Sequence, residues 1–194
     1  EIGNVGISAT DCVVSAVNEI IARGLIFPNK IGLTGHSFGG YETDFIITQT
    51  DLFAAAVAGS AATDMASFYL TMGWNTGKPD MWRFESQQWR MGKSLFEDWE
   101  GYSRNSPITN AVNISTPLLS WTGDNDLQVN WSQSIEFYLA LRRLKKQHIM
   151  LLYPGEKHTL NRLENQKDLS IRLHQWFDYH LKGIKADWIE TGLK

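Results

Sequence analysis

The chain has 194 residues, of which 43% are hydrophobic and 20% are charged. This length and composition are typical of one soluble globular domain with a sizeable core. A net charge of −3 is too small to indicate a nucleic-acid partner or attraction to a membrane surface. We therefore expect a folded domain that has neither kind of partner.

The single cysteine and the apolar segments set further limits. Cys12 is the only cysteine, which excludes an intrachain disulfide and a thiolate metal cluster. Because it stands among Val13, Val14 and Val17, we interpret it as a small buried residue on a helix. No apolar run approaches membrane-spanning length and no signal peptide is visible, so we expect no membrane span in this part. The chain opens on Glu1 rather than Met, which suggests that the true N-terminus is missing, and the localisation stays unknown.

The first elements are a loop and a helix. Residues 1–10 are expected to form a loop that ends at Thr10, a plausible N-cap. A helix is predicted over 11–23, since its apolar residues recur at positions i, i+1, i+4, i+7 and i+8. Gly24 closes this helix, and Pro28 begins the turn into the next strand.

The segment that follows carries the main chemical signal. A short apolar strand is predicted over 30–34, and a helix continues to Gln49. Between them stands a turn of five residues: Gly35, His36, Ser37, Phe38 and Gly39. This is the G-x-S-x-G pattern between a strand and a helix, which presents a serine as a nucleophile. The bare pattern also occurs in ordinary glycine-rich turns, but the strand and the helix favour catalysis.

The composition of this turn has a physical reason. A serine on a strained turn leaves no room for side chains two residues away, so Gly35 and Gly39 are expected to let strand and helix approach. The backbone N–H of Phe38 stands at a helix N-terminus. It can therefore donate a hydrogen bond to a developing oxyanion.

Three more strands are predicted, over 53–58, 117–121 and 148–153. Each is a short apolar run, typical of a strand that is covered on both faces. Helices are predicted over about 131–146 and 163–181. Strands that alternate with helices indicate an α/β fold, with a parallel sheet of about four strands and helices on both faces.

Residues 65–106 interrupt this alternation. They contain four of the eight tryptophans, at positions 74, 82, 89 and 99, with glycines and charged residues between them. We interpret the segment as a helical, tryptophan-rich insertion that folds over the sheet edge. Its aromatic residues are expected to fill a packing interface more often than to contact a substrate.

Three polar residues follow predicted strands, and the carboxyl ends of parallel strands are where function gathers. They are Ser37, Asp126 and His158. A serine nucleophile needs an imidazole base, and the base needs a carboxylate that fixes its tautomer. The chain order Ser, Asp, His is that of the α/β-hydrolases.

Each partner has a competitor. Asp124 also follows Gly123 and could take the place of Asp126. His158 could be an ordinary loop histidine. The other four histidines are poorer bases, because one adjoins the serine, one begins a strand and two lie in a helix: His36, His148, His174 and His180. No metal-ligand spacing and no phosphate-binding loop is present, so we expect no metal and no cofactor.

At this point the sequence resembles the prolyl oligopeptidase family of serine peptidases. The resemblance is carried by the residues from Gly35 to Tyr41, by the Gly-x-x-Asp-x-x-Val loop from Gly123 to Val129, and by the segment from Tyr153 to His158. It extends over nearly the whole chain, and its acid loop favours Asp126 over Asp124.

The resemblance implies a serine peptidase that cleaves short peptides. In that reading Ser37 attacks the carbonyl, His158 relays the proton, Asp126 orients His158 and Phe38 donates to the oxyanion. Gly39 and Gly40 then have structural roles. The resemblance also suggests an apolar substrate pocket around Met65, Phe68 and Tyr69, for which core packing is the default interpretation.

The chain matches only the C-terminal portion of that family's catalytic domain. The first half of its eight-stranded sheet, the loop with the second oxyanion donor and the usual upstream β-propeller are absent. This piece alone is expected to be weak or inactive, since losing one oxyanion donor costs about 10²–10³ in turnover. The strand at Ile31 is expected to have an unpaired edge, which favours a dimer or an aggregate.

Two other functions stay open. A carboxylic-ester hydrolase of the same fold uses the same three residues, and a fold does not determine a substrate. A non-catalytic fragment, in which these residues are vestigial, is the alternative from another class of protein.

Overall fold

The computed structural model describes residues 1–193, and a parallel four-stranded sheet forms its centre. The strands lie in the order β1-β2-β5-β6 and all neighbours pair in parallel. Their bounds are β1 (Gly32–His36), β2 (Ala55–Gly59), β5 (Leu118–Gly123) and β6 (His148–Tyr153). The prediction of a parallel α/β sheet of about four strands is confirmed.

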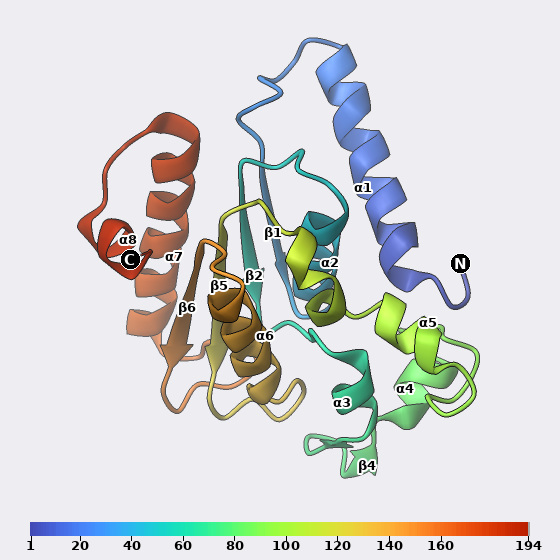
Figure 1. The fold of residues 1–194 in the computed structure, drawn as a ribbon. Coiled ribbons are helices and arrows are strands. Elements are labelled where there is room, and N and C mark those ends of the chain that lie inside the picture. Colours follow the sequence, from blue (N-terminus) through green and yellow to red (C-terminus); the bar gives the residue numbers. More distant parts are fainter. Residues whose placement is uncertain (194) are drawn as a thin grey trace.

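Helices cover both faces of the sheet (Figure 1). One face carries α2 (Phe38–Gln49), α6 (Ser132–Arg143) and the 3-10 helix η1 (Pro107–Asn113), and α1 (Val5–Ala22) packs on α2. The other face carries α7 (Leu163–Phe177), its π-helical continuation η2 (Asp178–Lys182) and α8 (Asp187–Gly192).

The two inner strands show why the sheet is sandwiched in this way. Every residue of β2 and β5 is buried, as strands covered on both faces require. Side chains alternate along β2, so Ala56 and Ala58 point to the face covered by α2 and α6, while Ala55 and Val57 point to the face covered by α7.

The start of the chain differs from the prediction. α1 begins at Val5, where a loop up to Thr10 was expected. The Thr10 hydroxyl does not cap the helix but donates to the carbonyl of Gly6 inside it, at 2.9 Å. A threonine that bonds back to residue i−4 in this way is satisfied within a helix. The predicted end is close to the observed one, since Arg23 is the C-cap and Gly24 follows with a φ of +68°.

Two interpretations of α1 were wrong. Cys12 is exposed rather than buried, because the helix buries only Val5 and Gly6, close to its start. The statement that no apolar run reaches membrane-spanning length also fails, since the 18 residues of α1 meet that criterion by length and composition. Core helices of soluble proteins and signal sequences meet the same criterion, so it is weak support for a membrane segment.

The C-terminal region also differs in detail. The helix predicted over 163–181 turns π-helical at Asp178, and Gly183 ends it with a φ of +73°. The short helix α8 was not predicted. It buries only Ile189, and a single apolar anchor produces no helical periodicity.

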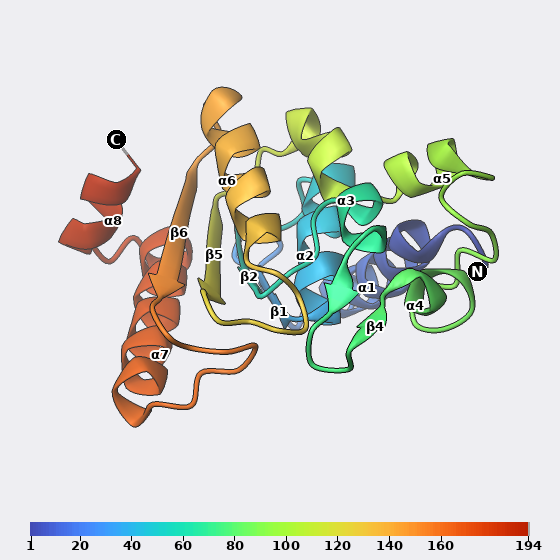
Figure 2. The same cartoon turned by 90° about the horizontal axis from the view of Figure 1, so that it is seen from below.

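The segment 65–106 contains helices and a small hairpin. Its elements are α3 (Met65–Tyr69), β3 (Met72–Gly73), β4 (Lys78–Pro79), α4 (Met81–Glu85) and α5 (Trp99–Arg104). They lie beyond the carboxyl ends of the strands and beside α1 and α2 (Figure 2).

An aromatic core joins this segment to α2. The Trp89 ring stacks on Phe84, with centroids 5.0 Å apart, and meets Tyr41 of α2 edge-on at 4.7 Å. The other three tryptophans of the segment are exposed: Trp74, Trp82 and Trp99. Of the four tryptophans, only Trp89 therefore fills the packing interface, together with other aromatic residues of the segment such as Phe84 and Tyr102.

β1 forms one edge of the sheet. Within residues 1–193 it pairs only with β2, and its residues alternate between exposed and partly buried. Unpaired N–H and C=O groups along such an edge can pair with another chain. Association of two copies through β1 stays a prediction.

His148 at the start of β6 is buried and has an unusual environment. Its Nε2 lies 2.7 Å from the Ser120 hydroxyl, while Nδ1 has no hydrogen-bond partner among the described residues. Burial lowers the pKa of His148 from its ordinary 6.5 to about 3, and the positive charge of Arg142 adds to this effect. The ring is therefore neutral in the folded state.

This histidine should make stability depend on pH. In the unfolded chain its ring takes up a proton below about pH 6.5, whereas the folded state resists protonation down to about pH 3. The stability present above pH 6.5 should therefore be lost progressively between those values. We expect His148→Gln to reduce the slope of the unfolding free energy against pH by the equivalent of up to about one bound proton. Urea denaturation at a series of pH values measures this slope. Parallel curves for the two proteins would contradict the burial argument.

Candidate active site

Ser37 lies on a strained turn between β1 and α2. Its φ is +60° and its ψ is −120°, a conformation that non-glycine residues adopt only when the surroundings enforce it. The turn is held on both sides, because Ser37 N–H donates to the Gly59 carbonyl at 2.8 Å and the Ser37 carbonyl accepts from Tyr41 N–H at 3.0 Å. This conformation presents the hydroxyl at the carboxyl end of the sheet.

The glycines around Ser37 play different parts. A Cβ at Gly35 would collide with the main chain of Gly39, and one at Gly40 would lie 2.6 Å from the Gly59 carbonyl oxygen. A Cβ at Gly39 would meet nothing within 4 Å. The close approach of strand and helix therefore requires Gly35 and Gly40, and the expectation that Gly39 must lack a side chain for this reason was wrong.

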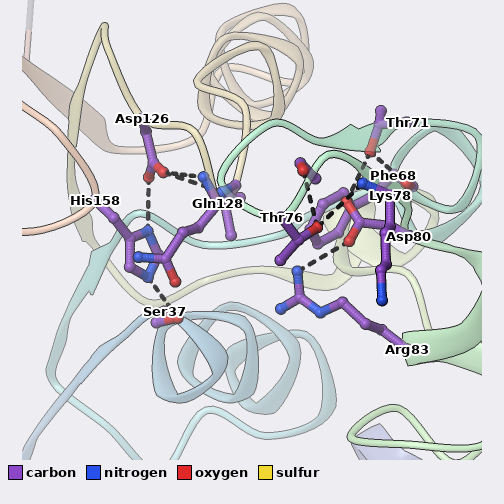
Figure 3. Close-up of polar contacts among 12 residues, drawn as sticks. Ser37, Phe68, Thr71, Thr76, Lys78, Asp80, Arg83, Asp126, Gln128 and His158 are labelled. Atoms are coloured by element: carbon purple, nitrogen blue, oxygen red, sulfur yellow. Dashed lines mark hydrogen bonds and ion pairs between the residues drawn. The ribbon is translucent and has the colours of Figure 1, made fainter.

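The structure brings Ser37, His158 and Asp126 together (Figure 3). His158 Nε2 lies 2.8 Å from Ser37 Oγ, and His158 Nδ1 lies 2.7 Å from Asp126 Oδ2. Asp126 and His158 are both buried, with exposed fractions of 3% and 8%. Since a carboxylate can only accept, Nδ1 carries the proton and Nε2 is free to accept the hydroxyl proton of Ser37.

The Asp126 carboxylate is fixed by its own loop. Its Oδ1 accepts hydrogen bonds from the backbone N–H groups of Gln128 at 2.8 Å and Val129 at 3.0 Å. Oδ2 is left to face His158 (Figure 3). Both oxygens of a buried carboxylate thus have partners, as low-dielectric surroundings require.

Asp124, the competing acid, has a different role. Its Oδ1 accepts the backbone N–H of Gly155 at 2.6 Å, which ties the loop after β5 to the loop after β6. Its carboxylate makes no hydrogen bond with His158 among the described residues. Geometry therefore places Asp126, and not Asp124, against the imidazole.

A buried carboxylate that the sequence did not reveal holds the loop of His158. Glu156 is 1% exposed and accepts hydrogen bonds from Asn161 N–H at 2.7 Å and from the Asn165 side chain at 2.6 Å. These hydrogen bonds, that of Asn161 first, lower the pKa of Glu156. Its main-chain carbonyl also accepts the N–H of Asn125 at 2.9 Å. Nothing in the motif marks this role of Glu156, because its partners follow it in the next loop and in the first turns of α7.

The backbone N–H of Phe38 occupies the predicted position for an oxyanion donor. Phe38 is the first residue of α2, and among residues 1–193 its N–H donates no hydrogen bond. The first N–H groups of a helix have no partner within the helix and lie at the positive end of its dipole. An anion formed next to Ser37 would meet this donor.

The three residues suggested for a substrate pocket are all buried in the aromatic core of the segment 65–106. Phe68 also lines a cavity of about 280 Å³ between that segment and the acid loop. The cavity is also lined by Leu70, Thr71, Met72, Trp74, Asp126, Leu127, Gln128 and Asn130. Of the three suggested residues, only Phe68 therefore borders this cavity, whose lining includes Asp126 but neither Ser37 nor His158.

Metal-ligating side chains do not cluster in the part of the chain that the structure describes. No group of three or more His, Cys, Asp or Glu side chains is arranged to hold a metal ion there.

A strained serine at the end of a parallel strand, with histidine and aspartate at neighbouring strand ends, defines the α/β-hydrolase class. The model of the prolyl oligopeptidase family matches residues 4–183. The chain therefore belongs to the prolyl oligopeptidase family, whose members are serine peptidases.

Individual relatives agree with this assignment. The chain is 33% identical over 183 residues to the uncharacterized peptidase YuxL of Bacillus subtilis, covering 92% of this chain and 27% of the relative. It is 26% identical to acylamino-acid-releasing enzyme 1 of Oryza sativa, covering 92% and 23% of the two chains.

Solved structures share the fold. A puromycin-hydrolyzing peptidase of Mycobacterium tuberculosis matches with a TM-score of 0.80 and 28% identity, over 92% of this chain and 26% of that one. An acylaminoacyl peptidase of Pyrococcus horikoshii matches with a TM-score of 0.83 and 23% identity, over 100% and 31%. The chain thus spans about a quarter of the length of the relatives that it matches.

The contrast between Gly39 and Gly40 can be tested by one methyl group at each position. Gly40→Ala should lower the free energy of unfolding by about 1–3 kcal/mol, because the new Cβ meets the Gly59 carbonyl. Gly39→Ala should leave it unchanged or raise it by up to about 1 kcal/mol, since alanine favours a helix more than glycine does. Urea denaturation of both variants measures the difference. Equal losses would show that the space around Gly39 does not accommodate a methyl group.

Proposed function

We propose that this protein is a serine peptidase that cleaves short peptides through an acyl-enzyme on Ser37. The observation that supports this proposal best is the continuous path of hydrogen bonds from Asp126 through His158 to Ser37. The membership in a family of serine peptidases supports it independently.

The proposed first step begins with proton transfer. His158 Nε2 takes the hydroxyl proton while Ser37 Oγ forms a bond to the carbonyl carbon of the substrate. The carbonyl oxygen becomes an oxyanion, to which Phe38 N–H donates. Asp126 stabilises the imidazolium that forms. His158 then gives the proton to the leaving amine, and the acyl group stays on Ser37.

Water completes the proposed cycle. His158 removes a proton from water, the resulting hydroxide attacks the acyl carbon, and Ser37 Oγ recovers its proton as the peptide acid leaves. The buried Asp126–His158 pair serves both halves of the cycle, because the same ring alternates between base and acid.

In this proposal the turn at Ser37 supplies one hydrogen-bond donor to the oxyanion. A second donor comes from a part of the protein beyond residues 1–193. Removing one such donor typically lowers turnover about 10²–10³-fold. We therefore expect the full activity to need parts of the protein beyond residues 1–193, and weak or no activity from these residues alone. An upstream β-propeller is a further prediction from the family resemblance.

The substrate proposal rests on the relatives and on the cavity. Relatives bear the names peptidase and acylamino-acid-releasing enzyme. The cavity of about 280 Å³ beside Asp126 is lined by both apolar and polar residues, among them Phe68 and Gln128. A side chain of the substrate that enters it would lie beside Asp126.

A fluorophosphonate probe tests the nucleophile in the full-length protein. The Ser37 oxygen should displace fluoride from phosphorus and retain the probe, which is visible as a fluorescent band after denaturing electrophoresis. Ser37→Ala should abolish this band, and heat-denatured protein should not be labelled, because labelling needs the assembled site. A folded protein that does not react would favour a non-catalytic role. Hydrolysis of a p-nitrophenyl ester without hydrolysis of any peptide anilide would instead favour an ester hydrolase.

Matched substitutions separate the two aspartates. Asp126→Asn should lower kcat by about 10³–10⁴-fold, since the amide no longer stabilises the required tautomer and the imidazolium. Asp124→Asn is the control. Its remaining side-chain oxygen can still accept Gly155 N–H, so kcat should change little. Steady-state kinetics of the full-length protein on a peptide anilide measures both, and a larger loss in the Asp124 variant would refute the assignment of the acid.

A further inference from the structure

Side chains at the carboxyl ends of β1 and β2 hold the main chain of His158. Its carbonyl oxygen lies 2.8 Å from Nε2 of His36 and 3.3 Å from the hydroxyl oxygen of Ser60. Among residues 1–193, no backbone N–H donates to this oxygen. The main-chain carbonyl of the proposed base therefore depends on two side-chain donors, of which His36 is the closer.

The chemistry of this contact fixes the proton of His36. A carbonyl oxygen only accepts, so Nε2 of His36 carries the hydrogen. Burial lowers the pKa of His36, and the hydrogen bond to the His158 carbonyl acts in the opposite direction. Nε2 can donate in the neutral ring of this tautomer and in the charged ring, so the contact does not require one charge state.

The ring of His36 is itself held in place. It stacks on the indole of Trp121 at the carboxyl end of β5, with centroids 5.1 Å apart and planes within 2° of parallel. The indole lies directly against Gly59, where any Cβ would collide with it. Residues at the ends of β1, β2 and β5 thus fix the direction of the His36 Nε2–H group.

We infer that His36 is a positioning residue for His158, whose main chain it fixes while Asp126 fixes the ring. The inference rests on the proposed function, in which His158 is the base. His36 directly precedes Ser37, so one turn both presents the nucleophile and holds the main chain of its base. The distance between Ser37 Oγ and His158 Nε2 is therefore controlled by a short path of covalent bonds and one hydrogen bond.

His36 does not act as the base itself. Its Nε2 is engaged with the His158 carbonyl, and it makes no hydrogen bond with Ser37 among the described residues. Its ring centroid lies 4.9 Å from that of His158, at a tilt of 42°. It therefore supports the neighbouring ring without contacting the hydroxyl.

Two substitutions separate the hydrogen bond from the stacking. His36→Phe keeps an aromatic ring against Trp121 and removes the donor. His36→Gln removes the ring but carries an amide N–H at about the same reach as Nε2. His174→Phe, at an exposed histidine of α7, controls for the exchange of histidine for phenylalanine. Thermal unfolding of each variant establishes that it is folded.

In the full-length protein we expect His36→Phe to lower kcat on a peptide anilide by about 10- to 100-fold with KM nearly unchanged, because a misplaced base slows the chemical step. His36→Gln should recover at least about tenfold of a hundredfold loss, and His174→Phe should match the parent. The proton on His158 Nδ1, which is hydrogen-bonded to Asp126, should give a low-field NMR signal. This signal should weaken or shift in His36→Phe and return in His36→Gln.

The outcomes distinguish this inference from the proposed function. A His36→Phe protein with the kcat and the low-field signal of the parent overturns the inference. So does a His36→Gln protein that is as impaired as His36→Phe in both readouts. If the parent is not labelled by the fluorophosphonate probe, the proposed function fails, while the NMR signal still decides whether His36 positions His158.

Discussion

The contact between Ser37 Oγ and His158 Nε2 at 2.8 Å is the constraint on which the site depends. It joins a turn after the edge strand β1 to a loop after the opposite edge strand β6, so its length is set by the whole width of the sheet. The two inner strands are buried along their full length, and helices pack on both faces. A hydrogen bond across four strands can keep one geometry because the sheet between its ends is rigid.

Two kinds of local structure position the reacting groups on this rigid sheet. The turn at Ser37 is strained, with a φ of +60°, and the tight contacts at Gly35 and Gly40 hold it in that state. The loops after β5 and β6 have no regular structure, and side chains pin them instead. Asp124 binds Gly155, while Glu156 binds the residues that follow His158. These contacts fix the conformation of the loops. They hold the imidazole of His158 at the carboxyl end of the sheet.

The segment 65–106 supplies none of the three proposed catalytic residues, but it lines the cavity beside Asp126. Its aromatic core packs on Tyr41 of α2, so it is anchored to the same helix that begins at the nucleophile turn. The cavity beside Asp126 lies between this segment and the acid loop. A change in the packing around Trp89 would therefore alter the shape of the space next to the candidate site without touching Ser37, His158 or Asp126.

Local pattern was enough to predict the sheet, its main helices and the three residues that the structure brings together, because apolar periodicity and the ends of strands are encoded within a few neighbouring positions. It failed where distant contacts decide. Cys12 looks buried among valines, yet little packs against that part of α1; Gly39 looks sterically required, yet it is Gly40 that meets Gly59. The sequence by itself determined which residues could form the site. Only the tertiary structure decided that Asp124 ties two loops together and that His36 holds the carbonyl of His158, since both depend on how loops from separate strands meet in space.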